Sequence, residues 1–159
     1  MSELDDLYQQ VILDHYKRPR NRRAIENPTG RAEGRNPLCG DHVTVTLSVE
    51  GDIVKDVAFE GGGCAISTAS ASMMTEALKG KTVDEARALF KRFHAVVKGE
   101  DTGEGPDLGK LEVFAGVSQY PVRVKCATLA WHTLDAALQN RGGTVTTEDE
   151  AAQSFSGGD

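Results

Sequence analysis

Apolar and polar residues alternate along two stretches of the chain, and this pattern predicts a β-hairpin. In residues 43–49 every odd position is apolar and every even position is polar, which is the period of a half-buried strand. A short turn is predicted at residues 50–52, and a second strand at residues 53–60, with Val57 and Phe59 facing inward. The economical interpretation is an antiparallel pair of strands joined by a tight turn.

Apolar residues spaced by three or four positions predict helices on both sides of this hairpin. Residues 2–16 read as an amphipathic helix with Ser2 as its N-cap. Residues 65–79 read as a second helix that ends at Gly80, and its inner face carries mostly small residues. That face would permit close packing.

Two further helices are predicted in the second half of the chain. Thr82 and Glu85 have the spacing of a capping box, which opens a helix that runs to about Val97. Pro121 stands where a helix can begin, and apolar residues at helical spacing continue from there to Leu138.

The segments between these elements have the composition of loops. Residues 18–37 contain three prolines and two glycines and are predicted to form a long surface loop. Residues 98–109 are rich in glycine and acids and are expected to be exposed, and residues 108–114 to form a short helix. Residues 142–159 lack periodicity, so we expect a disordered tail after a single domain at residues 1–141.

Composition and charge narrow the class of protein. A length of 159 residues suits one domain, and 39% hydrophobic and 26% charged residues are typical of globular chains. The net charge is −6, so the chain lacks the excess of basic residues that is typical of nucleic-acid-binding proteins. Residues 17–23 are locally basic and form either a solvated loop or a docking patch for an acidic partner.

Neither a membrane span nor a secretory signal is expected. No apolar run approaches the roughly 18 residues that a spanning helix needs, and the acidic, polar N-terminus is unlike a signal peptide. We therefore expect a cytoplasmic protein whose thiols stay reduced.

The chain has three cysteines, Cys39, Cys64 and Cys126, and glycines flank the first two. Asp41 follows Cys39 by two residues and offers a carboxylate. Three thiolates and one carboxylate make a plausible tetrahedral Zn²⁺ set. Four anionic ligands and one Zn²⁺ sum to −2, which the neighbouring Arg123 and Lys125 are placed to offset.

The predicted hairpin brings part of this set together. Cys39 and Asp41 lie just before the first strand, and Cys64 follows the second strand at the mouth of a helix. In an antiparallel hairpin the start of one strand lies beside the end of the other. Cys126, near the start of the last helix, completes the set if that helix packs on the sheet.

Helix N-termini also lower thiol pKa values, which favours the thiolate at Cys64 and Cys126. A Cys39 that leaves the metal would become a nucleophile on a glycine-flanked loop.

Other interpretations of these residues stay open. The cysteines could be packing residues, or the zinc site could be purely structural. A hydrolase using Cys39 and His42 is another alternative. His15 is expected to pack or snorkel on the first helix, and His94 and His132 to lie at the surface or at the edge of the core. His42 could reach the site, but in an extended strand it points to the opposite face from Asp41.

The sequence around the cysteines resembles the IscU/NifU N-terminal family of iron–sulfur cluster assembly proteins. The matching segments are residues 7–17, 38–41, 62–67 and 124–131, and the likeness spans residues 4–138. Within that family the chain is similar to the SufU branch. Lys125 replaces the histidine that precedes the third cysteine in the scaffold branch, and residues 118–123 replace its Leu-Pro-Pro-Val-Lys segment. The stretch around residues 99–116 also matches the insertion of the SufU branch.

The resemblance implies an α+β fold in which a short antiparallel sheet of about three strands packs against several helices. It also implies zinc held by Cys39, Asp41, Cys64 and Cys126. Cys39 would accept sulfane sulfur from a SufS-type cysteine desulfurase that carries pyridoxal phosphate. Arg123 would either help the two proteins dock or steady the acidic site. Sulfur would then pass to downstream cluster-assembly proteins.

The resemblance is compatible with more than one role for this protein. The same cysteines could hold iron or a [2Fe–2S] cluster as an assembly scaffold, or the protein could only activate the desulfurase by binding it. In either case we expect a carrier or partner protein rather than a stand-alone enzyme, monomeric or weakly dimeric, with no nucleic-acid or membrane partner.

Overall fold

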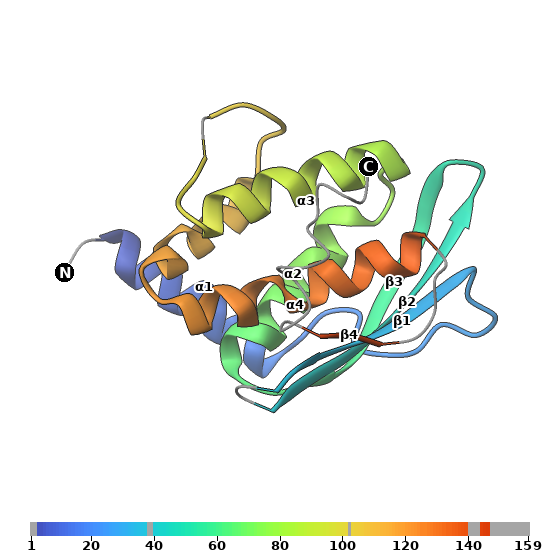
Figure 1. Cartoon of the computed structure of the whole chain (residues 1–159), viewed down its shortest axis with the longest axis horizontal. Helices are drawn as coiled ribbons and strands as arrows, with labels where there is room; N and C mark the ends of the chain where they lie inside the picture. Colours follow the sequence, from blue (N-terminus) through green and yellow to red (C-terminus); the bar gives the residue numbers. More distant parts are fainter. Residues whose placement is uncertain (1–2, 38–39, 102, 140–143, 147–159) are drawn as a thin grey trace.

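An antiparallel sheet packed against helices forms the fold in the computed structural model, which describes residues 3–37, 40–101, 103–139 and 144–146 (Figure 1). β2 (Asp41–Glu50) and β3 (Ile53–Gly62) make the predicted antiparallel hairpin. β1 (Gly30–Asn36) pairs antiparallel with the other edge of β2. A short β4 (Thr144–Thr146) pairs parallel with β1, so the sheet order is β3-β2-β1-β4. The predicted α+β class with three antiparallel strands is confirmed.

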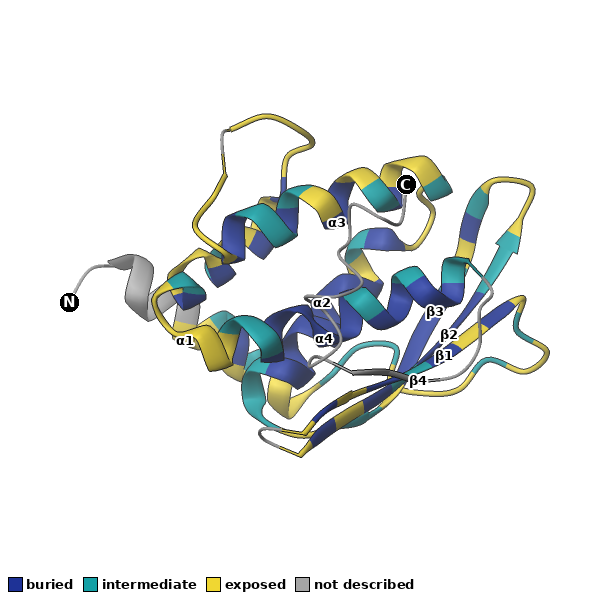
Figure 2. Cartoon of the chain, viewed as in Figure 1, coloured by how far each residue is buried: buried dark blue, intermediate teal, exposed yellow. Residues whose placement is uncertain are grey.

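The alternation of the hairpin residues decides which face of the sheet is covered. Val43, Val45 and Leu47 are buried, and so are Val57 and Phe59 on the neighbouring strand. This is the inward face predicted from the sequence. The opposite face carries mostly exposed and half-buried residues (Figure 2), although Thr46 and its cross-strand partner Ala58 are buried there.

The expectation of a long surface loop over residues 18–37 is wrong at its end, because β1 lies within it. The inward positions of β1 are small or polar: Gly30, Ala32, Gly34 and Asn36 are buried. A Cβ atom at Gly34 would lie 2.0 Å from the Thr133 hydroxyl oxygen. The strand is therefore glycine-rich because a helix packs directly on its backbone. It lacks the alternating β-branched residues from which most strands are predicted.

The predicted disordered tail at residues 142–159 also requires a correction. Residues 144–146 form β4, in which Glu33 pairs with Thr144 and Arg35 with Thr146. The Thr-Val-Thr sequence is favourable for a strand because all three residues are β-branched. The rest of the predicted tail, residues 142–143 and 147–159, lies outside the described residues.

The four long helices predicted from the sequence are confirmed within a residue or two of their expected ends. The short helix predicted at residues 108–114 is present as a 3₁₀ helix, but it continues to Gln119. The structure has five helical elements in the described residues: α1 (Glu3–Lys17), α2 (Ala65–Leu78), α3 (Val83–Val97), the 3₁₀ helix η1 (Gly109–Gln119) and α4 (Pro121–Leu138). Both halves of the Thr82–Glu85 capping box are present at the start of α3. The predicted N-cap of α1, Ser2, lies outside the described residues.

α2 and α4 cover the inner face of the sheet, and α3 lies on their far side (Figure 1). Trp131 of α4 is fully buried and stacks on Phe93 and Phe90 of α3, with ring centroids 4.6 and 5.8 Å apart. The core is therefore continuous from the sheet through α2 and α4 to α3, and Figure 2 shows buried residues on each of these elements. This packing fixes α4, and with it Cys126, relative to the strands.

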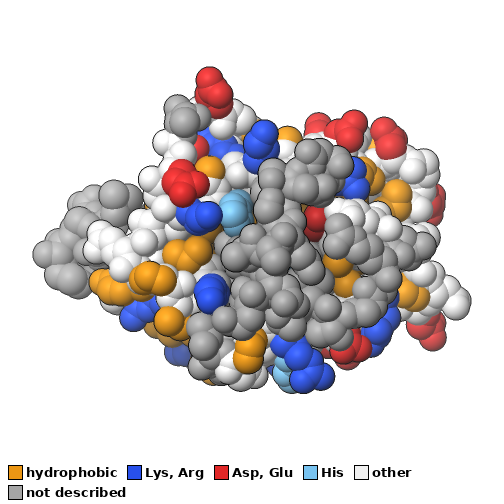
Figure 3. All heavy atoms as spheres, in the orientation of Figure 1, with side chains coloured by type: hydrophobic (Ala, Val, Ile, Leu, Met, Phe, Trp, Pro, Cys, Tyr) orange, Lys and Arg blue, Asp and Glu red, His pale blue; other side chains and the backbone are white. Residues whose placement is uncertain are grey.

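Charged side chains gather on loops and helix ends. The predicted exposed loop after α3 carries acidic residues, which Figure 3 shows at the top of the molecule, and Arg92 donates to the Pro106 carbonyl at 2.7 Å. In the basic stretch at residues 17–23, Arg20 pairs with Asp14 and Arg23 with Asp56. Part of that stretch is thus neutralised by the protein's own carboxylates. Among the described residues, no helix is both long and apolar enough to cross a membrane.

Candidate metal and sulfur site

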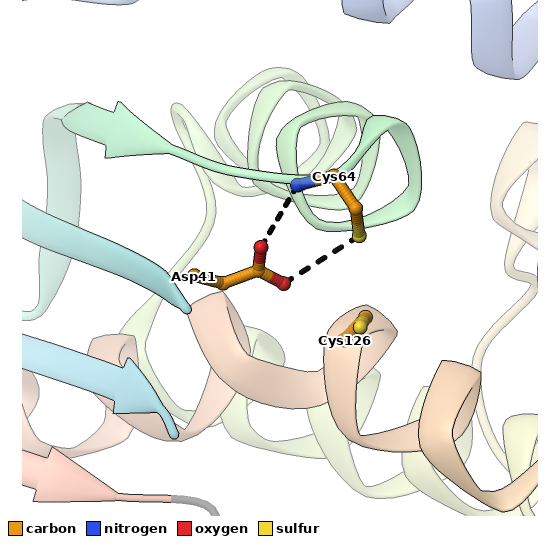
Figure 4. Close-up of side chains that lie close together, drawn as sticks. All are labelled: Asp41, Cys64 and Cys126. Atoms are coloured by element: carbon orange, nitrogen blue, oxygen red, sulfur yellow. Dashed lines mark hydrogen bonds between the residues drawn. The ribbon is translucent and has the colours of Figure 1, made fainter. Parts of the chain in front are cut away.

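Asp41, Cys64 and Cys126 meet at one end of the sheet, and one potential ligand atom from each lies within 4.8 Å of the others. Asp41 is the first residue of β2, Cys64 directly precedes α2, and Cys126 is in the second turn of α4. Figure 4 shows the three side chains reaching from these elements into the same space. Two are buried and Cys64 is half-buried.

The hairpin register explains why Asp41 and Cys64 are neighbours. His42 pairs with Gly62, so the start of β2 lies beside the end of β3, as the antiparallel pattern predicted. The Cys64 N–H donates to Asp41 Oδ1 at 2.8 Å, and the Cys64 thiol donates to Oδ2 at 3.5 Å (Figure 4). The carboxylate therefore ties the strand to the start of α2.

Gly63 makes room for this carboxylate. Its φ is +155°, and a Cβ atom there would lie 1.8 Å from Asp41 Oδ1. Only glycine fits, because any side chain would occupy the space of the Asp41 carboxylate. The third glycine of the run before Cys64 is therefore a steric requirement of the site.

The Cys64 sulfur caps the N-terminus of α2. It accepts a hydrogen bond from the Ser67 N–H at 3.4 Å. The pKa of the Cys64 thiol falls from its ordinary value of 9.0 to about 7, mainly because of a hydrogen bond with the Cys126 side chain. Burial opposes this shift, the Ser67 N–H adds to it, and Asp41 raises the pKa. Cys64 is thus biased toward the thiolate, the form that binds metal.

Cys126 is held by the contact between α2 and α4. Ser70 of α2 donates to the carbonyl of Ala127 at 2.5 Å, and the Trp131 indole N–H donates to the Ser70 hydroxyl at 3.1 Å. The sulfur of Cys126 also contacts β1, because the Asn36 side-chain amide donates to Cys126 Sγ at 3.6 Å. Neither Cys64 nor Cys126 forms a disulfide.

The donor set fits a zinc ion. Zn–S bonds of about 2.3 Å and Zn–O bonds of about 2.0–2.2 Å place tetrahedral ligand atoms roughly 3.3–3.8 Å apart. The Cys64 sulfur and Asp41 Oδ2 are already 3.5 Å apart. Two sulfurs and one carboxylate oxygen provide three of the four ligands that a tetrahedral site needs.

Three further residues were predicted for the site: Cys39, Arg123 and Lys125. Cys39 lies outside the described residues. Arg123 is exposed, and its guanidinium lies over the Tyr120 ring, 4.5 Å from the centroid. Lys125 is half-buried in the same helical turn as Cys126. The cations next to Cys126 thus differ in exposure, and Arg123 faces solvent.

Among the described residues, the four histidines lie outside the cluster of Asp41, Cys64 and Cys126. His42 is exposed, on the opposite face of β2 from the buried Asp41. His15 is buried and bonds to the Ser72 hydroxyl through Nδ1, at 2.7 Å. His94 and His132 are half-buried and pack against the Phe90 ring at the edge of the core.

Sequence reasoning missed two contributors to the site. Asn36 lies within residues 18–37, whose composition predicts a loop. Its contact with Cys126 joins residues 90 positions apart, which local patterns do not predict. Ser67 contributes through its backbone N–H, which carries no side-chain signature. The signal available for Ser67 was its place three residues after a helix-capping Cys64.

Comparison with known proteins identifies relatives of this chain. Residues 7–127 match the family described as "NifU-like N terminal domain". The chain is 46% identical to the zinc-dependent sulfurtransferase SufU of Bacillus subtilis, over 89% of this chain and 96% of that protein. It is 39% identical to the iron–sulfur cluster assembly scaffold protein IscU of Streptococcus pyogenes, over 94% of each.

A solved structure has the same fold. It is a putative iron–sulfur cluster assembly scaffold protein for the SUF system from Fervidobacterium islandicum, with a TM-score of 0.77 and 41% identity. The match covers 84% of this chain and 97% of that one. The chain therefore belongs to the family of NifU-like N-terminal domains.

Proposed function

We propose that this protein serves iron–sulfur cluster assembly as a zinc-dependent sulfurtransferase. The observation that carries the proposal is the convergence of Asp41, Cys64 and Cys126, from three separate elements, within 4.8 Å. Such a cluster of one carboxylate and two thiols, one of them with a lowered pKa, suits metal and sulfur chemistry. The relative in Bacillus subtilis carries the name of this activity.

Zinc would be held by Asp41, Cys64, Cys126 and Cys39. Cys39 is two residues before Asp41 in the sequence, and two peptide units separate their Cα atoms by at most about 7.6 Å. It can therefore supply the fourth ligand. When bound, zinc would keep the thiolates deprotonated and hold them in a fixed arrangement.

Cys39 is the proposed acceptor of sulfur. Its thiolate attacks the outer sulfur of a persulfide on the active-site cysteine of the desulfurase. A new S–S bond forms at Cys39, the S–S bond on the donor breaks, and the donor cysteine leaves as a thiolate. One sulfur atom changes carrier and no external oxidant or reductant is needed.

The proposed donor is a SufS-type cysteine desulfurase with pyridoxal phosphate, in the cytoplasm, and the recipients are later cluster-assembly proteins. Arg123 is exposed and stacked on Tyr120, so it presents a cation to solvent three residues before Cys126. We assign Arg123 to docking and Lys125 to balancing the negative charge of the ligands.

A second function, assembly of a [2Fe–2S] cluster on the same thiolates, is favoured by the scaffold name of the relative in Streptococcus pyogenes. Thiolates ligate iron as readily as zinc. Persulfide transfer is preferred because Lys125 stands where the scaffold branch has a histidine.

The test combines the protein, purified with its native metal, with a cysteine desulfurase and cysteine. We expect faster desulfurase turnover and a mass increase of one sulfur atom on the peptide containing Cys39. The Cys39→Ala variant should lose both effects while still binding the desulfurase. If Cys39→Ala stimulates turnover as well as the wild-type protein does, Cys39 is not the acceptor. A stable, transferable iron–sulfur cluster in zinc-free protein would instead favour the scaffold.

A further inference from the structure

Asn36 is a buried polar residue at the end of β1 whose side chain reaches the candidate metal site. It has no exposed surface, and its amide Nδ2 lies 3.6 Å from Cys126 Sγ. A buried amide is costly unless its hydrogen-bonding groups find partners. A polar residue placed here against a sulfur therefore calls for an explanation beyond packing.

Strand pairing fixes the backbone position of Asn36. Asn36 lies directly opposite Asp41 in the β1–β2 register. Its backbone carbonyl accepts a hydrogen bond from the Gly40 N–H at 2.9 Å. The pairing of β1 with β2 thus brings both Asn36 and Asp41 to the site, from neighbouring strands.

The chemistry of the donor set explains why an amide is useful at this point. With four anionic ligands the loaded site carries a charge of −2, so each thiolate gains from a hydrogen-bond donor. Cys64 receives one from the Ser67 N–H. Cys126 receives one from Asn36. An amide donates without adding charge, whereas an aspartate of the same size would add a further negative charge.

We propose that Asn36 is a positioning residue of the metal site: its amide N–H orients the Cys126 thiolate and stabilises its charge when metal is bound. This inference rests on the proposed function. Hydrogen-bond partners of metal ligands tune affinity in this way, and their loss typically weakens binding about 10–100-fold.

The test uses the full chain loaded with Co²⁺, whose thiolate-to-metal absorption reports on sulfur. In Asn36→Leu and Asn36→Asp, Co²⁺ and Zn²⁺ affinity, measured by chelator competition, should fall about 10–100-fold. Asn36→Asp should lose more because its carboxylate repels the thiolates. The charge-transfer band of Asn36→Leu should move to longer wavelength, because a sulfur without its donor gives up charge more easily.

Thr133→Val is the matched control. Thr133 is fully buried on the same helix as Cys126 and donates to the Leu129 carbonyl at 2.8 Å. Valine has nearly the same shape, so this variant loses one buried hydrogen bond away from the site. It should keep the wild-type metal affinity and band position.

A measurement on the wild-type protein covers the case in which the Asn36 variants do not fold. In protein loaded with an NMR-active cadmium isotope, the hydrogen bond should transmit a coupling from the metal through Cys126 Sγ to the Asn36 side-chain amide proton. Absence of that coupling, or Asn36→Leu with wild-type affinity and band position, overturns the inference. Failure of the wild-type protein to show thiolate-to-cobalt absorption would instead overturn the proposed function.

Discussion

The Asp41 carboxylate bridges the backbone and the sulfur of Cys64. Oδ1 accepts from the Cys64 N–H at 2.8 Å, and Oδ2 accepts from the thiol at 3.5 Å. The same carboxylate is thus both a structural anchor for the start of α2 and a candidate metal ligand. These two roles can be separated by substitution, because only one of them requires a negative charge.

Asp41→Asn should keep the anchor and weaken the metal site. The amide oxygen still accepts from Cys64 N–H, but the ligand is no longer an anion. We expect zinc affinity, measured by competition with a chromogenic chelator, to fall about tenfold or more, which corresponds to at least about 1.4 kcal/mol.

Asp41→Ala removes both roles. It should weaken zinc binding further and lower the free energy of unfolding of the metal-free protein by about 1–3 kcal/mol, because a buried N–H loses its acceptor. Zinc retention equal to the wild-type value in both variants would show that Asp41 is not a ligand.

Gly63→Ala should disturb the same carboxylate by sterics alone. The new methyl group would overlap Asp41 Oδ1, and the positive φ of Gly63 would add strain of about 1–3 kcal/mol. We expect both lower stability in urea unfolding and zinc affinity reduced at least about tenfold.

Gly51→Ala separates backbone strain from displacement of the ligand. Gly51 also has a positive φ, +63°, but among the described residues no atom beyond its two chain neighbours lies within 4 Å of its Cβ position. This variant should lose about 1–2 kcal/mol of stability with unchanged zinc affinity. Equal zinc affinity in the two variants would mean that the space beside Asp41 is not needed for metal binding.

The closeness of Asp41 and Cys64 could be predicted from the sequence, whereas the strand beside them could not. The hairpin of β2 and β3 was readable because burial selects apolar residues at alternate positions, and its register alone brings Asp41 near Cys64. β1 was not readable, because close packing of α4 selects glycine at positions 30 and 34 in place of apolar side chains. The contact between Asn36 and Cys126 could not be predicted either, because it joins a strand to a helix that is distant in the sequence.

His15 should make stability depend on pH. Burial lowers its pKa from the ordinary 6.5, and the nearby Arg20 lowers it further, against the raising effects of Glu76 and Asp14. Arg20 N–H donates to the Ser72 hydroxyl, whose own hydrogen is then available to His15 Nδ1. Because the unfolded state takes up the proton first, the stabilisation is complete above about pH 6.5 and is lost as pH falls toward the folded value.

The check is urea unfolding of wild type and His15→Gln between pH 8 and pH 5. The free energy of unfolding of the wild-type protein should fall more steeply with acidification than that of the variant. Parallel curves would show that the histidine titrates alike in the folded and unfolded states.

X-ray absorption at the zinc edge of the purified wild-type protein tests the metal centre most directly. We predict a first coordination shell of three sulfurs at about 2.3 Å and one oxygen at about 2.0–2.2 Å, with one sulfur lost in Cys39→Ala. A shell of only oxygen and nitrogen, or an unchanged sulfur count in Cys39→Ala, would contradict a site built from three cysteines and Asp41.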